Sequence, residues 1–218
     1  MTERLDERLR RETRPLHTAA ERAGVMQLLL KGGLPLHVYA ALLFNLQAIY
    51  SALEEALQHH RKDACIARIF NAALQRSARL AADLDALAEH QTFALEGATQ
   101  KYVARLRKLD AEAPRCLVAH AYVRYLGDLN GGQALKRLVA RQYGLAQDLG
   151  TTFYEFGSSD QVAAMRDAFR SSLAEMPLGA DEIDAVAAEA CEAFRWHVEL
   201  FEELHQRHIT GHIKAANG

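Results

Sequence analysis

Apolar side chains recur every three or four residues along almost the whole chain, and this spacing places them on one face of an α-helix. No segment of useful length alternates apolar and polar residues as a strand does, and no repeat or low-complexity linker interrupts the pattern. The breaks coincide with clusters of Gly, Pro and polar residues such as KGGLP and HQTFALEG. The pattern predicts seven helical segments, at about residues 5–23, 36–60, 64–89, 98–110, 114–143, 161–175 and 181–208.

These segments predict an all-α fold, in which residues 1–218 form a single domain of packed helices. We expect its core to span about residues 5–208 and the polar end, residues 209–218, to form a tail. Pro15 allows either a bend in the first helix or a helix start near Thr13. Asp160 is the expected N-cap of the sixth helix, and GLAQDLGTTFYEFGSSD before it is a loop of uncertain form.

Charge and cysteine content narrow the class of protein. The net charge is −2, which argues against a nucleic-acid-binding protein that relies on a basic field. The three cysteines, Cys65, Cys116 and Cys191, are odd in number and widely spaced, so we expect a reducing, cytoplasmic location and no disulfide framework. The charged N-terminus, the polar C-terminus and the lack of a long apolar run predict neither a signal peptide nor a membrane anchor.

The most unusual stretch is HAYVRYLGDLNGGQ, residues 120–133, which places Gly127, Gly131 and Gly132 in an otherwise helical segment. Each glycine costs a helix interior about 1 kcal/mol relative to Ala. The stretch is either a turn that breaks the helix or a continuous helix with Gly127 and Gly131 on one face. In the second case a flat ligand can lie almost against the backbone, next to Asp128. The spacing excludes an EF-hand loop, a dinucleotide fingerprint and a phosphate-binding loop.

A basic stripe surrounds one histidine near the N-terminus. Arg10, Arg14 and His17 stand at i, i+4 and i+7, so they share one side of a helix. A lone histidine is more often an ordinary core or surface residue, but two arginines beside it suit a ligand that carries a metal and carboxylates. Heme is such a ligand, because its iron takes an imidazole and its propionates take cations. Arg166 and Arg170 are also spaced i, i+4, and on spacing alone they indicate a solvated helix face.

The last predicted helix contains an alternative metal motif. Glu202 and His205 form an ExxH, which is half of a ferritin-like di-iron signature, but the chain has no second ExxH. His205, His208 and His212 share a stripe that predicts a solvent-facing patch. No GxSxG motif supports a Ser-His-Asp mechanism.

Several motifs in the same order resemble those of the biliverdin-producing heme oxygenases, over about residues 5–208. AHAYVRYLGDLNGGQ resembles the signature of the distal helix of that family, and LRRETRPLHTAAERAGVM resembles its proximal helix. AIYSALEEAL and ELFEELHQ resemble further family blocks, and the anchorless C-terminus is similar to that of the soluble bacterial members. The resemblance implies a multi-helix fold with heme sandwiched between a proximal helix and a kinked distal helix.

The resemblance also implies a role for individual residues. His17 would be the proximal iron ligand, with Glu21 one turn later. Gly127 and Gly131 would lie over the heme face, and Asp128 would organise water around iron-bound oxygen. The propionate cations would be Arg10, Arg14, Arg166 and Arg170. The apolar walls would be Met26, Phe194 and Phe201, and the pocket or its hydrogen-bond network would include Tyr50, Tyr122 and Arg124.

Four positions depart from the commoner family pattern. Asn130 replaces a frequent Ser, His197 stands where the animal enzymes often have Asn, and Leu95 stands where they have Tyr. Pro15 lies just before the implied iron ligand. These departures imply a differently connected distal water network, while the ligand and the distal acid are retained.

The implied reaction opens heme, which is both cofactor and substrate, at a meso carbon to give biliverdin, CO and Fe²⁺. It would use O₂ and electrons from NADPH, delivered by a ferredoxin or flavodoxin and its reductase on the basic proximal face. The arginines that fix heme rotation favour the α isomer, and a biliverdin acceptor is a further candidate partner. Two other classes are open: a heme carrier or sensor of the same fold, and a non-heme, thiaminase-like enzyme. Asp128 among glycines argues against the first, and His17 beside its arginines argues against the second.

Overall fold

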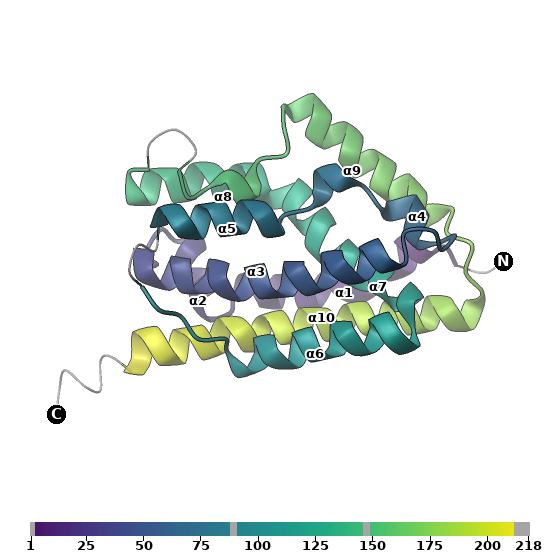
Figure 1. The fold of residues 1–218 in the computed structure, drawn as a ribbon, viewed down its shortest axis with the longest axis horizontal. Coiled ribbons are helices and arrows are strands. Elements are labelled where there is room, and N and C mark those ends of the chain that lie inside the picture. Colours follow the sequence, from purple (N-terminus) through teal and green to yellow (C-terminus); the bar gives the residue numbers. More distant parts are fainter. Residues whose placement is uncertain (1–2, 88–90, 146–148, 212–218) are drawn as a thin grey trace.

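The computed structural model describes residues 3–87, 91–145 and 149–211, and within these ranges it is almost entirely helical and has no strand (Figure 1). The all-α prediction is therefore confirmed. The α-helices are α1 (Leu5–Glu21), α2 (Gly24–Leu30), α3 (Leu36–His59), α4 (Ile66–Ile69), α5 (Ser77–Leu87), α6 (Gly97–Glu112), α7 (Leu117–Ala121), α8 (Gly127–Tyr143), α9 (Ser159–Ala174) and α10 (Ala180–His205). Short 3₁₀ turns lie at Ala72–Leu74, Pro114–Cys116 and Thr152–Tyr154, and π-helical turns at Tyr122–Leu126 and Gln206–Thr210.

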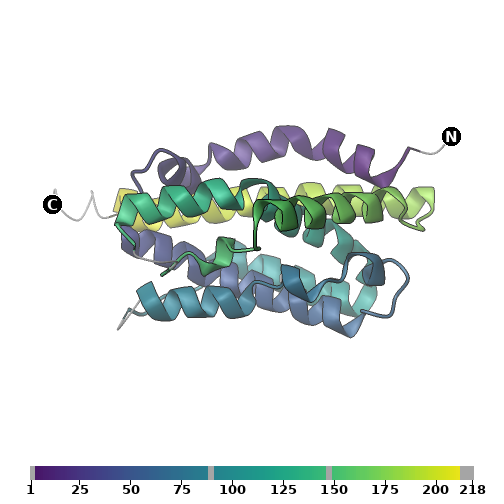
Figure 2. The ribbon, with the colours of Figure 1, turned by 90° about the horizontal axis from the view of Figure 1, so that it is seen from above.

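Two long helices, α3 and α10, organise the packing. α3 packs against α5 and α6, while α10 packs against α1, α2, α6 and α7 (Figure 1). Figure 2 shows α1, in purple, lying along one side of the bundle above α10 and α8. α1 and α10 come from opposite ends of the chain, so their contact joins the first and last helices of the bundle.

α3 is the central core helix. By length and composition alone it could cross a membrane, but 61% of its most apolar window is buried inside the protein. Tyr39, Ile49 and Leu53, for example, are completely buried. A core helix passes the same test as a membrane span, and the packing of α5 and α6 on α3 explains why it is apolar on most sides.

α1 runs without interruption past Pro15, so a helix start near Thr13 is wrong. A proline inside a helix has no amide hydrogen for the ladder. The hydroxyl of Thr13 donates to the carbonyl of Leu9 at 2.7 Å one turn earlier. The helix therefore carries His17 on its last turns as a continuation of the same element.

A separate helix, α2, follows a sharp turn that the sequence pattern did not reveal. The turn depends on Gly24, whose φ is +35°. A Cβ at this position would lie 2.0 Å from the carbonyl oxygen of Phe201 on α10. The amide of Gly24 also donates to Oε1 of Glu202 at 2.9 Å. The close approach fixes the start of α2 on α10, and only glycine permits it.

The prediction of one helix over residues 64–89 is wrong, because the chain there forms α4, a 3₁₀ turn and α5. The break is stabilised by Glu54 of α3, whose carboxylate accepts hydrogen bonds from the amides of Arg76 and Ser77 at the start of α5. The guanidinium of Arg76 is buried and donates to the carbonyl of Glu155 at 2.7 Å. These partners are distant in sequence, so the periodicity of the segment could not show the break.

Two predicted helix ends also differ. Ser158, not Asp160, caps α9: its hydroxyl accepts from the amide of Gln161, whose side chain accepts from the amide of Ser158 at 2.8 Å. After α10 the helical path continues as a π turn to Thr210, into the predicted tail. Residues 212–218 of that tail lie outside the described residues.

The predicted helix at 114–143 is confirmed as one helical path that passes through α7, a π turn and α8. The alternative of a glycine turn that breaks the helix is therefore wrong. The π turn at Tyr122–Leu126 has a wider winding than an α-helix, and such turns often occur at functional sites. It joins α7 to α8 and places Arg124 between them.

Candidate functional site

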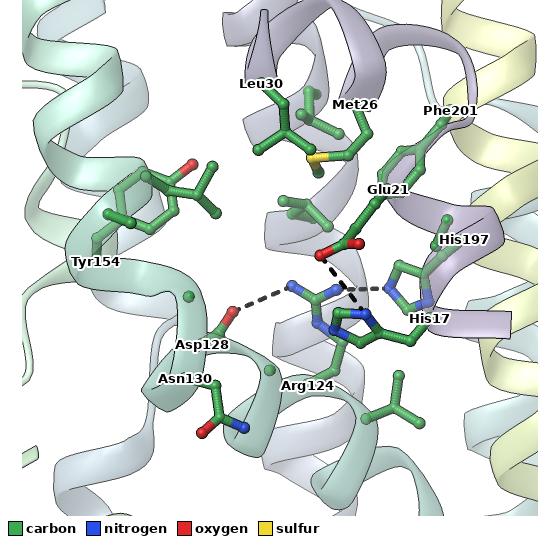
Figure 3. A pocket seen from close by; sticks show the side chains of 18 of the residues that line it. His17, Glu21, Met26, Leu30, Arg124, Asp128, Asn130, Tyr154, His197 and Phe201 are labelled. Atoms are coloured by element: carbon green, nitrogen blue, oxygen red, sulfur yellow. Dashed lines mark hydrogen bonds and ion pairs between the residues drawn. The ribbon is translucent and has the colours of Figure 1, made fainter. Parts of the chain in front are cut away.

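A cavity of about 520 Å³ lies between α1, α2 and α8 (Figure 3). This volume is within the ~300–1,000 Å³ that small-molecule and cofactor sites occupy. The cavity is lined by His17, Ala20, Glu21, Met26, Leu30, Leu42, Leu46, Val123, Arg124, Gly127, Asp128, Asn130, Gly131, Ala134, Leu135, Leu138, Phe153, Tyr154, Phe194, His197 and Phe201. Most of these side chains are apolar, which suits a large hydrophobic ligand.

His17 and Glu21 form the polar part of the wall on α1, and we call this pair the α1 wall. The His17 side chain is 53% exposed, and its Nδ1 lies 3.6 Å from Oε1 of Glu21. Its ring meets Phe194 edge-on, with the ring centroids 5.9 Å apart. The Glu21 contact engages Nδ1, so Nε2 is the ring nitrogen suited to a metal ion.

The glycines of α8 form a bare surface on the other side of the cavity. Gly127 and Gly131 both line it, and an added Cβ at either position would meet no atom within 4 Å. Gly132 is different, because a Cβ there would lie 3.7 Å from the carbonyl oxygen of Tyr154. The sequence-based expectation that Gly127 and Gly131 share one face agrees with this geometry, and Gly132 points off that face. A flat ligand can therefore approach the α8 backbone directly.

Four buried polar residues form a connected group beside the glycines, which we call the buried network. Arg124 donates from Nε to the hydroxyl of Tyr50 at 3.0 Å and from Nη1 to Nε2 of His197 at 2.7 Å. Its Nη2 lies 3.6 Å from Oδ1 of Asp128, and the Tyr50 hydroxyl donates to the other oxygen of that carboxylate. Figure 3 shows the guanidinium between Asp128 and His197. One arginine thus connects a tyrosine, an acid and a histidine.

Burial dominates the pKa values in the buried network. It raises the pKa of the Asp128 carboxyl above its usual 3.8, although the charge of Arg124 and the Tyr50 hydrogen bond oppose the change. Burial also raises the pKa of Tyr50 well above 10, and with the charge of Arg124 it lowers the pKa of His197 well below 6.5. At neutral pH, Tyr50 is protonated and His197 is uncharged. For Asp128, burial raises the pKa while Arg124 and Tyr50 act to lower it, and such opposed effects often occur at groups that handle protons.

Two of the four arginines implied by the resemblance, Arg10 and Arg170, lie in the neighbourhood of Tyr122. Tyr122 contacts Thr13 through its hydroxyl at 3.1 Å, and burial raises its pKa against the charges of Arg170 and Arg10. Arg170 also donates to Oδ1 of Asn130, a cavity residue, at 3.4 Å. Arg10 and Arg170 are therefore close enough to Tyr122 for their charges to affect it, although none of the three lines the cavity.

The other two arginines are not brought to the cavity. Arg14 is exposed on α1, and Arg166 on α9 contacts Asp167, its neighbour in sequence, at 3.3 Å. Arg166 thus matches the solvated helix face that its spacing indicated.

The remaining implied residues lie at the cavity or next to it. Met26, Phe194 and Phe201 line it, whereas Tyr50 reaches it only through Asp128. The wall residues that no sequence motif indicates are mainly apolar: Leu30, Leu42, Leu46, Leu135, Leu138, Phe153 and Tyr154. Phe153 and Tyr154 come from the loop of uncertain form, where two adjacent aromatic residues were the available signal.

The ExxH of the last helix does not assemble a metal site. Glu202 accepts the hydrogen bond from Gly24, and His205 contacts Thr210. Across the described ranges, no group of three or more His, Cys, Asp or Glu residues could hold a metal ion. His212 lies outside the described residues.

Comparisons with known proteins give one consistent result. A family profile described as Heme oxygenase matches residues 3–203. "Heme oxygenase" of Guillardia theta is 33% identical over 212 residues, covering 96% of this chain and 90% of the relative. "Heme oxygenase 1" of Synechocystis sp. is 35% identical over 207 residues, covering 94% of this chain and 86% of the relative.

Solved structures agree with the sequence comparisons. The structure of heme oxygenase-1 from Synechocystis sp. PCC6803 in complex with heme has a TM-score of 0.90 and 33% identity, with 99% of each chain covered. That of heme oxygenase from Leptospira interrogans has a TM-score of 0.87 and 32% identity, covering 92% of this chain and 100% of that one.

Proposed function

This chain belongs to the heme oxygenase family, and from that premise we propose that its cavity holds heme between His17 on α1 and the glycine face of α8. As a heme oxygenase it is an oxidoreductase that cleaves heme to biliverdin. In this proposal CO and Fe²⁺ are the other products, and O₂ is the oxidant. Heme, when bound, supplies both the iron that activates oxygen and the ring that is opened.

The observation that carries the placement is the contrast between the two sides of the cavity. An imidazole projects from α1 into the cavity, while Gly127 and Gly131 on α8 have no side chain and open space in front of them. The rest of the lining is mainly apolar. These are the requirements of a flat, apolar macrocycle that takes one nitrogen ligand on one face and needs room for a small molecule on the other.

His17 would bind the iron through Nε2, because Glu21 lies beside Nδ1 and would orient the ring. On the α8 side, Asp128 would hold a water molecule and a proton at its carboxyl, next to the open face of the helix. The apolar side chains would exclude other water. The bare helix surface at Gly127 and Gly131 would leave room for a small molecule between the ring and α8, so that these residues would contribute by position.

Arginines at the cavity edge would fix the rotation of heme. Arg170, which donates to the cavity residue Asn130, and Arg10, whose charge also acts on Tyr122, would form a propionate site there. Arg14 and Arg166 would join it by turning from the solvent, and Arg166 would have to leave Asp167. We propose that this clamp selects the α isomer of biliverdin. Chromatography of the pigment should give mainly that isomer, and a majority of β or δ would contradict the assignment.

Electrons would come one at a time from NADPH, through a ferredoxin or flavodoxin and its reductase. The half-exposed His17 and the exposed Arg10 and Arg14 place a basic surface next to the iron site, which suits an acidic donor protein.

Cys65, Cys116 and Cys191 are free thiols, which supports a reducing, cytoplasmic location. The packing of α1 on α10 supports one domain over residues 1–218. A protein that receives biliverdin would complete the set of partners.

The experiment adds hemin to the purified protein and then ascorbate or a reductase system in air. We expect a Soret band that decays as biliverdin absorbance rises in the red. A stable Soret band would indicate a heme carrier or sensor, and the absence of a band would contradict heme binding altogether.

A further inference from the structure

His197 of α10 is a titratable residue in the cavity wall that the mechanism above does not use. Its side chain lines the cavity and the residue is 3% exposed. The ring meets Tyr102 at a right angle, with the centroids 5.2 Å apart, and also contacts Phe201. These ring contacts restrict its orientation.

Both ring nitrogens of His197 are hydrogen-bonded, and the chemistry of the partners fixes the tautomer. Nδ1 lies 2.7 Å from the carbonyl oxygen of Ala193, which can only accept, so Nδ1 carries the hydrogen. Nε2 lies 2.7 Å from Nη1 of Arg124, and a guanidinium can only donate, so Nε2 is a bare acceptor. The ring is therefore the neutral Nδ1–H form, and it presents a lone pair to Arg124.

The contact with His197 determines where the rest of the Arg124 guanidinium points. A guanidinium is a planar fork, so fixing one nitrogen and the plane also sets the other two. With Nη1 on His197, Nε reaches Tyr50 at 3.0 Å and Nη2 faces Asp128 at 3.6 Å. The shortest of these three contacts is the one to the histidine.

We propose that His197 is a positioning residue: as a neutral acceptor it orients Arg124, and through Arg124 it holds Asp128 and Tyr50 in place for the proton transfer. This proposal rests on the proposed function of Asp128. The neutral tautomer also excludes His197 as a proton donor to the substrate, because its single N–H is directed to the carbonyl of Ala193. Burial and the charge of Arg124, which lower the pKa of this histidine, support the same neutral form.

Because a guanidinium has only donors, the hydrogen bond runs from Arg124 to His197. The ring of His197 is held in one tautomer, so its acceptor is already in place, whereas an Asn or Gln side chain can rotate and has to turn its oxygen toward Arg124. The guanidinium keeps its remaining donors for Tyr50 and Asp128.

The first test uses the full-length protein without heme, so it does not depend on the reaction. Long-range ¹H–¹⁵N correlations of the histidine rings at neutral pH should show His197 with a protonated Nδ1 and a bare Nε2. An Nε2–H tautomer or an imidazolium would overturn the proposal, whatever the activity of the enzyme.

The second test compares three variants by hydrogen exchange at Nε of Arg124 and by single-turnover biliverdin formation. His197→Phe keeps a ring but removes the acceptor. Because a hydrogen bond to a charged group contributes about 1.5–3 kcal/mol, Nε–H exchange should accelerate about tenfold or more. His197→Gln restores an acceptor oxygen and should recover most of the protection and of the single-turnover rate.

His120→Phe is the matched control, because His120 is another fully buried histidine but its hydrogen bonds go to Tyr102 and Glu189. It should destabilise the fold without a comparable change at Arg124. Equal effects of His197→Phe and His197→Gln, or of His197→Phe and His120→Phe, would reduce His197 to a packing residue. Normal exchange at Arg124 in His197→Phe would overturn the positioning role. Faster exchange at Arg124 with unchanged turnover would instead count against the proposed role of Asp128.

Discussion

The α1 wall and the buried network face the same cavity but are constructed in different ways. His17 is half exposed, and its two contacts, at 3.6 Å to Glu21 and edge-on to Phe194, leave it adaptable. In the buried network, Arg124 makes three contacts of 2.7 to 3.6 Å while its side chain is only 12% exposed. The α1 wall can therefore follow its ligand, whereas the buried network is fixed before any ligand arrives. Substitutions in the first should change function alone, and substitutions in the second should change folding as well.

The largest functional effect should come from His17→Ala. We expect loss of biliverdin formation, because no other residue of the α1 wall offers a nitrogen to iron. The free energy of unfolding should change by no more than about 0.5 kcal/mol, since the side chain is half exposed. Added imidazole should restore the axial ligand in the Soret spectrum. Full turnover with an unchanged spectrum would show that His17 is not the ligand.

The largest effect on stability should come from Arg124→Met. The change leaves Asp128 buried without its cation, and breaking such a pair typically costs about 3–5 kcal/mol. Urea unfolding of the heme-free protein measures this cost. Adding Asp128→Asn should recover part of it, because the unpaired charge is then removed. A cost below about 1 kcal/mol is typical of an ordinary surface ion pair. It would contradict the view that the buried network, unlike the α1 wall, stabilises the fold.

Paired glycine variants test whether the bare face serves the ligand or the fold. Gly131→Leu should leave the protein as stable or more stable by up to about 1 kcal/mol, because the position is open and helical. Heme titration should nevertheless show weakened binding. Gly132→Leu should show the reverse: it meets Tyr154 and Phe156, and overpacking costs about 1–3 kcal/mol. Similar results for the two variants would contradict the assignment of the faces.

The smallest expected effect is a change in the acid dependence of stability, and it comes from a second buried cluster. Tyr102 separates this cluster from His197. Glu189 accepts hydrogen bonds from Nε2 of His120 at 3.1 Å and from Nη2 of Arg105 at 2.6 Å, and His120 also contacts Tyr102. Burial favours a higher pKa, but these hydrogen bonds and charges outweigh it and lower the pKa of Glu189 from 4.5 to about 2.

This lowered pKa predicts how stability depends on acid. Because the folded pKa lies below the unfolded one, the contribution is complete above pH 4.5 and is lost as the pH falls toward 2. Urea midpoints measured down to about pH 3 should therefore fall more steeply for the native protein than for Glu189→Gln. Parallel curves would show that Glu189 is not held by this cluster.

The parts of the molecule that depend on local pattern could be predicted from the sequence. The long helices follow from their apolar spacing, and the open faces of Gly127 and Gly131 follow from their i, i+4 spacing in a helix. The break before α5 depends on Glu54, and the start of α2 depends on the backbone of Phe201. Both partners are distant in sequence, so no local pattern contains them.

The site shows the same limit. His17 and Asp128 could be identified from motifs, but the partner of His197 could not, because Arg124 is 73 residues away. Arg166 was assigned to the propionates by resemblance, yet it contacts Asp167 on its own helix. Side-chain direction at an exposed position depends on neighbours and ligands that spacing alone does not reveal.

The packing of α1 on α10 has a consequence for biosynthesis. About 160 residues separate the end of α1 from the start of α10. At the usual speed of a ribosome, α1 waits roughly 8–30 s before the helix it packs on has been made. Throughout that interval His17 lies on a helix that lacks its main packing partner, although α2 and α9, which also pack on α1, are made before α10. We therefore expect a nascent chain to take up heme only after α10 has emerged.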